Sequence, residues 1–73
     1  MQRAVLIGCG AMSRAWLEAA KAIDGLEIAG LADIEVERAR LRAAEFGLAD
    51  ARIAASLGAL LADGGIDIVF DVT

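Results

Sequence analysis

The chain has 73 residues, of which 59% are hydrophobic and 4% aromatic, with seven basic and eleven acidic side chains and a formal net charge of −4. This composition is too apolar for a disordered segment, and the basic residues form no block that would bind nucleic acid. No apolar run approaches the roughly 18 residues needed to span a bilayer, and the sequence carries no secretory signal pattern.

The first apolar run, residues 3–7, ends abruptly at Gly8 and predicts a strand buried on both faces. The residues that follow change to helical spacing, and Asp24-Gly25 is a turn signal that ends this helix. Its core-facing side is expected to carry Met12, Trp16, Ala19 or Ala20, and Ile23. Trp16 is therefore expected to be a core residue.

Residues 26–32 form a second apolar run, which stops at Asp33 and predicts a second strand. Residues 35–46 then predict a helix that ends at Gly47. Its buried side is expected to carry Val36, Ala39, Ala43 and Phe46. Opposite-charge pairs spaced three residues apart are expected on its solvated side, namely Glu35/Arg38, Glu37/Arg40 and Arg42/Glu45.

Residues 51–54 predict a short third strand, Ser56 is expected to cap a short helix over residues 57–62, and residues 66–72 predict the last strand. In that strand one face is expected to carry Ile66, Ile68, Phe70 and Val72. The alternation predicts an α/β fold, a partial Rossmann fold with order βαβαβαβ and a parallel sheet of strand order 3-2-1-4. Residues 1–73 are expected to form the N-terminal part of one dinucleotide-binding domain.

The segment Gly8-Cys9-Gly10-Ala11-Met12-Ser13 follows a strand and opens a helix, which is the context of a dinucleotide-binding turn. The first glycine permits a tight turn, and the second lets the backbone approach a pyrophosphate. Free N–H groups at the start of the helix are expected to face the phosphates. Ser13 stands where Gly or Ala is usual, and its hydroxyl is expected to be within reach of a phosphate.

Asp33 ends the second strand twenty residues beyond Ser13. A carboxylate there accepts hydrogen bonds from the adenosine ribose hydroxyls and repels a 2′-phosphate, which favours NAD over NADP. Arg38, one turn into the next helix, keeps NADP open as the lesser choice. Alternatively Asp33 is the N-cap of that helix, and the two roles can coexist.

Three other residues keep two interpretations each. Cys9 is either a small side chain packed at the strand end or a thiol activated by the helix N-terminus. Arg14 is either solvated or in contact with a phosphate. Asp71 either serves a function at the carboxyl edge of the sheet or finds a partner or solvent, because an unpaired buried carboxylate is unfavourable. Asp67, at the opposite end of its strand, is expected to be structural.

The sequence contains no His and no Tyr, and Lys21 is its single lysine. It therefore lacks most of the side chains that act as acids and bases near neutral pH, and we expect neither catalytic residues nor a metal site. The single cysteine cannot form a disulfide within the chain, which favours a reducing, cytoplasmic setting.

Three segments, Ala4 to Ser13 (AVLIGCGAMS), Leu31 to Gly47 (LADIEVERARLRAAEFG) and Ile66 to Thr73 (IDIVFDVT), resemble the N-terminal part of one oxidoreductase family. This is the glucose–fructose oxidoreductase/inositol dehydrogenase/rhizopine catabolism family (Gfo/Idh/MocA). The resemblance implies a pyrophosphate cradle made of Gly8, Gly10, Ala11, Met12 and Ser13, with Asp33 on the adenosine ribose. It also matches Thr73 to a threonine that precedes proline in the next cofactor-contacting loop, so it implies that Thr73 binds the cofactor. It places the catalytic lysine and histidine in later segments.

Three functions follow from this sequence. The first is an NAD(P)-binding fragment of an oxidoreductase, without turnover of its own. The second is an autonomous or engineered half-domain without activity, homodimeric through the edge of its fourth strand. If the chain is instead part of a longer protein, the rest of the parent domain is expected to pair at that edge. The third is a fragment of an S-adenosylmethionine-dependent methyltransferase, which also uses a glycine turn and an acidic residue after the second strand.

Overall fold

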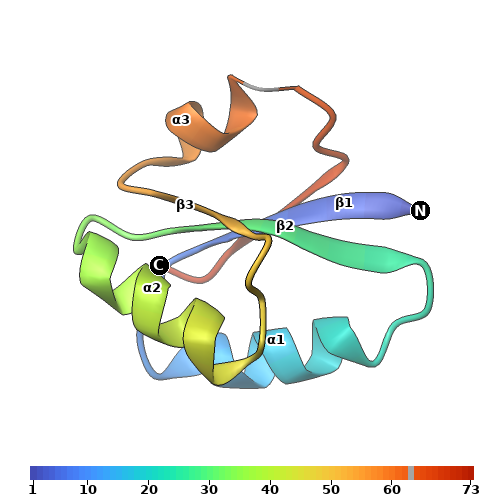
Figure 1. Cartoon of the computed structure of the whole chain (residues 1–73), viewed down its shortest axis with the longest axis horizontal. Coiled ribbons are helices and arrows are strands. Elements are labelled where there is room, and N and C mark those ends of the chain that lie inside the picture. The colour runs from blue at the N-terminus through green and yellow to red at the C-terminus, as the bar shows by residue number, and fades with distance from the viewer. Residues whose placement is uncertain (63) are drawn as a thin grey trace.

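Strands and helices alternate along the whole chain in this computed structural model, which describes residues 1–62 and 64–73 (Figure 1). The elements in chain order are β1 (Gln2–Ile7), α1 (Met12–Lys21), β2 (Leu26–Ala32), α2 (Val36–Glu45), β3 (Arg52–Ala54), α3 (Leu57–Leu61) and β4 (Ile68–Asp71). Each predicted element is present, and the short third strand and the helix capped by the Ser56 hydroxyl are confirmed.

The four strands form one parallel sheet in the order β3-β2-β1-β4. This confirms the predicted partial Rossmann fold. The strand order reverses at β1, which pairs with β2 on one side and with β4 on the other. In such sheets, ligands bind outside the carboxyl ends of the strands at this point of reversal.

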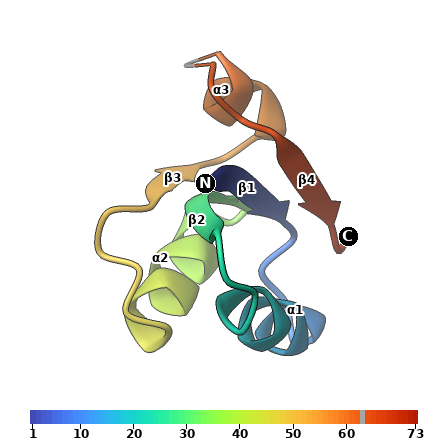
Figure 2. The same ribbon diagram turned by 90° about the vertical axis from the view of Figure 1, so that its right-hand side faces the viewer.

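The two faces of the sheet are covered unequally. The ten-residue helices α1 and α2 lie against one face, and the five-residue helix α3 lies on the other (Figures 1 and 2). The larger core cluster, on the α1 and α2 side, contains Ala4, Leu6, Cys9, Leu17, Ala20, Ile28, Leu31, Ala39 and Ala43. The smaller cluster, under α3, contains Val5, Ala32, Ala54 and Leu60.

The buried side of α1 is one residue out of step with the sequence prediction. The side chains that face the core are Ser13, Leu17 and Ala20. The residues expected there, Met12, Trp16 and Ile23, are 65%, 42% and 53% exposed. Small and aliphatic side chains allow the helix to approach the sheet closely, whereas an indole ring would hold it away. The Trp16 ring instead lies at the sheet edge, 5.6 Å from the ring of Phe70.

Strand β4 is shorter than predicted, and Ile66, which precedes it, faces the opposite side from the rest of the predicted strand. Ile68, Phe70 and Val72 pack against the larger cluster as expected, but Ile66 packs with the smaller cluster on the opposite face. The reason lies at Asp67, whose N–H donates to the Arg3 carbonyl and whose carboxylate accepts from the Arg3 N–H, both at 2.8 Å. These bonds redirect the chain before the strand begins.

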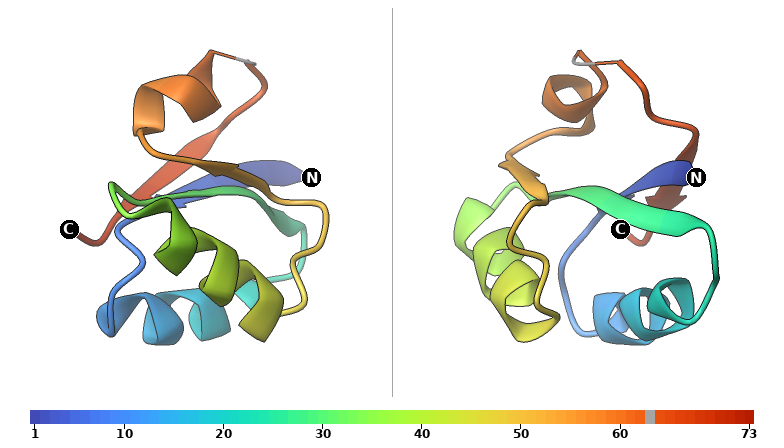
Figure 3. Two further views of the ribbon diagram at one scale, coloured as in Figure 1. Left: turned by 60° about the vertical axis from the view of Figure 1, so that its left-hand side comes forward. Right: turned by 45° about the vertical axis from the view of Figure 1, so that its right-hand side comes forward.

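The two termini lie at opposite ends of the sheet, so the last residues of the chain reach the carboxyl edge near the turn between β1 and α1 (Figures 1 and 3). Within residues 1–62 and 64–73, no helix has the length and apolar character that crossing a membrane requires.

Candidate functional site

The turn after β1 is fixed by its first glycine. Gly8 has a φ of +95°, and its N–H donates to the Ala32 carbonyl at 2.9 Å. A Cβ atom on this residue would lie 2.9 Å from the carbonyl carbon and oxygen of Val72 and 3.0 Å from the Thr73 nitrogen. A side chain is therefore excluded both by the backbone angle and by the segment that follows β4. This contact also brings Thr73 to the turn.

The second glycine, Gly10, has open space around it, in contrast to Gly8. A Cβ atom at Gly10 would meet nothing within 4 Å, and its φ is not positive, so the fold itself does not require glycine here. Helix α1 begins next to it, with Ala11 as an N-cap that makes no side-chain hydrogen bond. Among the described residues, no acceptor is hydrogen-bonded to the amides of Gly10, Ala11 and Met12. The positive end of the helix thus faces open space beside a glycine.

Asp33 directly follows β2 and lies at the same edge of the sheet as the glycine turn. Its Oδ2 accepts a hydrogen bond from the Cys9 N–H, and its Oδ1 accepts one from the Glu35 N–H, both at 2.8 Å. These two bonds hold the pKa of the carboxyl below its usual range, so the group is ionised at neutral pH. The N-cap of α2 is Glu35, so the prediction of Asp33 as N-cap is wrong by two residues.

Ser13 is buried beneath the turn and does not face the open space. Its hydroxyl donates to the Gly10 carbonyl at 2.5 Å and accepts a hydrogen bond from Arg42 Nε at 2.9 Å. The expectation that this hydroxyl is within reach of a phosphate is therefore wrong. The Ser13 amide is also used, because it donates to the Gly10 carbonyl at 3.1 Å.

Arg42 is the residue of this site that sequence reasoning missed. The spacing predicted a solvated pair with Glu45, and the ion pair exists at 2.6 Å, but the Arg42 side chain is only 13% exposed. Its guanidinium also donates to the carbonyls of Cys9 and Gly10 at 3.1 and 3.2 Å. The pairs Arg38/Glu35 and Arg40/Glu37 are exposed, as predicted.

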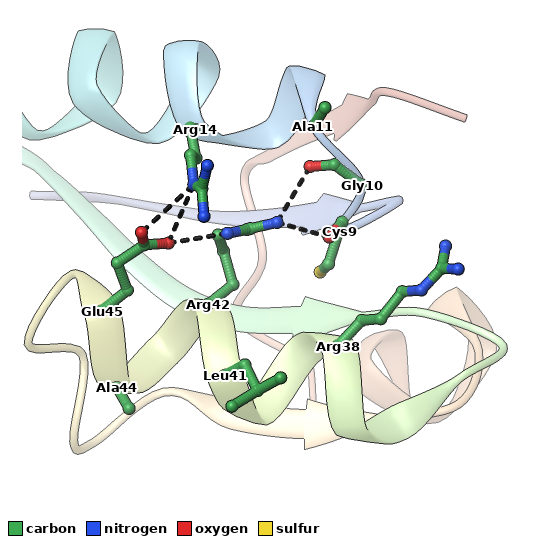
Figure 4. A pocket seen from close by; sticks show the side chains of 9 residues that line it. All are labelled: Cys9, Gly10, Ala11, Arg14, Arg38, Leu41, Arg42, Ala44 and Glu45. Carbon is green, nitrogen blue, oxygen red and sulfur yellow. Dashed lines mark hydrogen bonds and ion pairs between the residues drawn. The ribbon is translucent and has the colours of Figure 1, made fainter.

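A pocket of about 830 Å³ lies beside the turn, between the start of α1 and the outer side of α2. Figure 4 shows its lining residues, Cys9, Gly10, Ala11, Arg14, Arg38, Leu41, Arg42, Ala44 and Glu45. Glu45 joins two of its cations, since it pairs with Arg14 at 3.1 Å as well as with Arg42. Arg14 is exposed, which agrees with the solvated one of its two interpretations, and its pairing with Glu45 is an added contact.

Cys9 is packed and unreactive. It is buried, and its Sγ lies 3.5 Å from the Ala32 carbonyl oxygen. Burial raises the pKa of the thiol to about 11, with a further rise from Asp33 and an opposing effect of Arg42. A thiol with this pKa carries almost no thiolate at neutral pH, so packing is the correct one of the two interpretations.

Asp71 is the last residue of β4, and Asp67 directly precedes the strand. Asp71 is exposed on this edge strand, and its Oδ1 accepts hydrogen bonds from the Thr73 N–H at 3.1 Å and hydroxyl at 2.6 Å. These bonds lower the pKa of the Asp71 carboxyl. Asp67 is structural, as predicted, because it binds the backbone of Arg3 at the opposite edge.

Lys21 lies at the end of α1, away from the glycine turn, and its Nζ donates to the Phe46 carbonyl at 2.7 Å. It therefore offers no acid or base at the site. No cluster of three or more potential metal ligands occurs among the residues for which positions are described.

No protein-family model matches the sequence, and no curated protein matches it significantly. Solved structures do match, over 99% of this chain. They include an oxidoreductase from Agrobacterium radiobacter in complex with NAD+, L-tartaric acid and magnesium, with 35% identity and a TM-score of 0.86. A second is a mutant of KijD10, a 3-ketoreductase from Actinomadura kijaniata, in complex with TDP-benzene and NADP, with 25% identity and a TM-score of 0.83.

A third is an NAD-binding protein from Listeria innocua, with 36% identity and a TM-score of 0.78. This chain spans only about a fifth of the length of these structures, 20%, 22% and 20% respectively. The fold and the comparisons together define a partial Rossmann-type α/β fold, similar to one part of NAD(P)-binding oxidoreductases.

Proposed function

We propose that this chain binds the pyrophosphate and the adenosine ribose of a nicotinamide dinucleotide, as the N-terminal part of a dinucleotide-binding domain of the Gfo/Idh/MocA family. The observation that carries the proposal is the arrangement of Asp33, whose ionised carboxylate is tied to the turn at Cys9, beside the open Gly10. The matches to NAD- and NADP-bound oxidoreductases support it.

The residues at the turn fit a pyrophosphate. Gly10 leaves room for a close backbone approach, and the amides of Gly10, Ala11 and Met12 can donate to phosphate oxygens at the positive end of α1. Gly8 shapes the turn and holds it against Thr73. In this proposal Ser13 contributes by packing beneath the turn.

The carboxyl of Asp33 fits the ribose. Each of its oxygens accepts one backbone hydrogen bond, and a carboxylate oxygen can accept another, which leaves room for the ribose hydroxyls. We propose NAD as the preferred cofactor, because the negative charge of Asp33 repels a 2′-phosphate. The nearby Arg38 is already paired with Glu35 at 2.6 Å, which reduces its attraction for that phosphate.

The nicotinamide, when bound, supplies hydride transfer. The residues of this chain bind and orient the adenosine half, and we propose that the groups acting on a substrate belong to other segments of an oxidoreductase. We therefore expect negligible turnover from these 73 residues alone. A cytoplasmic location forms part of the proposal, and the buried single thiol agrees with a reducing environment.

Isothermal calorimetry with NAD, NADP and S-adenosylmethionine tests the binding proposal. We expect the order NAD, then NADP, with no heat from S-adenosylmethionine, and a loss of NAD affinity of about tenfold or more in Asp33→Ala. The matched control is Asp67→Ala, which removes a carboxylate that also holds a backbone amide at 2.8 Å but lies at the other edge. Tighter binding of S-adenosylmethionine would establish the methyltransferase interpretation instead.

A second function rests on the edge of the sheet at β4, which within the described residues pairs with no strand other than β1. The Val72 N–H donates to the Ile7 carbonyl, so by alternation Val69 and Asp71 direct their backbone groups outward. Val69 is also 41% exposed. We propose that this edge pairs with a second copy of the chain or with the rest of a parent domain.

The charges favour one antiparallel arrangement of two copies. A twofold axis at Phe70 places Val69 opposite the partner's Asp71, whereas an axis at Val69 would place Asp71 opposite the partner's Asp67 and oppose two acids. Sedimentation velocity tests this pairing. We expect a dimer that Val69→Asp converts to monomer, because this change places two acids directly opposite each other. A stable monomer of the unaltered chain at high concentration would contradict the pairing.

A further inference from the structure

The guanidinium of Arg42 lies between α2 and the glycine turn, with its side chain 13% exposed. Its Nη2 donates to the carbonyls of Cys9 and Gly10 at 3.1 and 3.2 Å, and its Nε donates to the Ser13 hydroxyl at 2.9 Å. Its Nη1 donates to Glu45 at 2.6 Å. Four of its five N–H groups thereby donate to other groups of the protein, so only one N–H remains for a ligand.

These bonds fix the direction in which the turn presents its amides. In a trans peptide the carbonyl and the following N–H point in opposite directions. Because the carbonyls of Cys9 and Gly10 point inward to Arg42, the N–H groups of Gly10 and Ala11 point away from it, toward the open side of the turn. Those are amides for which the described part of the chain offers no hydrogen-bonded acceptor.

Arg42 also brings a permanent positive charge beneath the turn. Glu45 is shared between Arg42 and Arg14, so the cluster has two cations and one anion. The chain as a whole has a net charge of −4. The positive charge beneath the turn favours an anion there and offsets the negative charge of the nearby Asp33 carboxylate.

Ser13 completes the arrangement. Its hydroxyl donates to the Gly10 carbonyl at 2.5 Å and accepts from Arg42, so the carbonyl is held from two sides. A glycine or alanine at this position would leave the Arg42 Nε without that acceptor. The departure of Ser13 from the usual pattern and the burial of Arg42 therefore have one explanation.

We propose that Arg42, together with Ser13, is a positioning residue of a phosphate-binding turn: it orients the amides of Gly10 and Ala11 toward the ligand and attracts the pyrophosphate through its charge. The inference rests on the proposed binding of a dinucleotide at this turn.

The first test compares Arg42→Met with Arg40→Met in calorimetric titrations with NAD. Both changes remove one arginine from α2, but Arg40 is exposed and pairs with Glu37 on the same helix. We expect the dissociation constant for NAD to rise about tenfold in Arg42→Met and less than about twofold in Arg40→Met. Equal effects in the two variants would overturn the proposal.

Arg42→Lys separates orientation from charge. A lysine keeps the charge, but its ammonium cannot reproduce the planar fork that joins two carbonyls and the Ser13 hydroxyl. We expect an intermediate loss of NAD affinity with the salt dependence of the unaltered protein, and a weaker salt dependence in Arg42→Met. This variant also keeps the test decisive if Arg42→Met does not fold. Affinity in Arg42→Lys equal to that of Arg42→Met would overturn the role of the charge.

A measurement without ligand distinguishes failure of this inference from failure of the proposed function. Carbonyl 13C shifts in NMR spectra report hydrogen bonding, and we expect those of Cys9 and Gly10 to move in Arg42→Met and Ser13→Ala but not in Arg40→Met. Unchanged shifts would overturn the positioning role even if NAD binds. Shifted carbonyls in a protein that does not bind NAD would support the positioning of the turn and reject the dinucleotide function.

Discussion

Two aspartates at opposite ends of the sheet make nearly the same contact. Asp33, at the carboxyl edge, accepts a hydrogen bond from the Cys9 N–H just after β1, and Asp67, at the amino edge, accepts one from the Arg3 N–H near the start of β1, both at 2.8 Å. Only their surroundings differ. The Arg3 carbonyl also accepts a hydrogen bond from the Asp67 N–H, and the Arg3 side chain pairs with Glu27.

The surroundings of Asp33 leave donors and space for a ligand. The open side of Gly10 lies next to the uncapped start of α1, and the ionised carboxylate is held from β2. A carboxylate bound to a backbone amide is therefore not by itself a sign of function in this fold. The carboxyl edge becomes a candidate site because the polar groups there retain unused hydrogen-bonding capacity.

The largest expected effect compares glycines at the two edges. Gly8→Ala places a Cβ atom 2.9 Å from the Val72 backbone at a φ of +95° and should destabilise the fold by about 3 kcal/mol or more. Gly25→Ala, at the amino edge, has a φ of +81° and meets nothing within 4 Å, so it should cost about 1 kcal/mol. Urea denaturation measures both, and equal losses would contradict the close contact at Gly8.

The second expected effect compares the two aspartates directly. Asp33→Asn should raise the dissociation constant for NAD about tenfold, because an amide accepts fewer hydrogen bonds from the ribose. Asp67→Asn should leave that constant within about twofold and lower stability by about 1 kcal/mol. Calorimetric titration and urea denaturation of both variants separate the two roles. A larger loss of NAD affinity in Asp67→Asn than in Asp33→Asn would mean that NAD binds at the amino edge of the sheet and not at the carboxyl edge.

A smaller effect is expected at Gly10. Gly10→Ala adds a methyl group in open space and should change stability by only about 0.5 kcal/mol. It should nevertheless weaken NAD binding about fivefold, because the methyl group occupies the space where the pyrophosphate approaches the backbone. Affinity unchanged in this variant would place the phosphates elsewhere.

The smallest expected effect is a dependence of stability on pH. The pKa of Asp33 is lower in the folded than in the unfolded chain, where it lies near ~3.9. The stabilisation is therefore fully present above the unfolded value and is lost as the pH falls through the folded one. Urea denaturation at a series of pH values from about 6 to about 3 should show that the free energy of unfolding declines less steeply for Asp33→Asn than for the unaltered protein. Because Asp71 and Glu45 also have lowered pKa values, only the difference between the two proteins is informative.

The sequence predicts the fold well because its signals are local. Apolar runs that end at Gly8 and Asp33, together with the alternation of periods, are sufficient to predict the strands and helices. The topology rules of parallel α/β folds then give the observed strand order. The hydrophobic pattern of a helix does not show how closely that helix packs on the sheet. The sequence therefore did not predict that α1 buries Leu17 and leaves Trp16 partly exposed. The direction of Ile66 was missed for a similar reason, since it depends on bonds between Asp67 and Arg3, 64 residues apart.

The candidate site was predicted in outline but not in its supporting contacts. Spacing places Gly8, Gly10 and Asp33 at one edge. The spacing of Arg42 and Glu45, three residues apart on a helix, predicted that Arg42 is exposed to solvent, because such pairs are usually exposed. Only the fold brings Arg42 under the turn, 29 residues from Ser13, and the unusual Ser13 was the one signal that another group was needed there.

Two-dimensional NMR of the labelled chain during addition of NAD tests the central claim most directly. The account predicts that the largest amide shifts fall on the turn at Gly10, Ala11 and Met12 and around Asp33, with small shifts at Arg3, Gly25 and Asp67. Largest shifts at the amino edge, or no shifts at millimolar NAD, would contradict it.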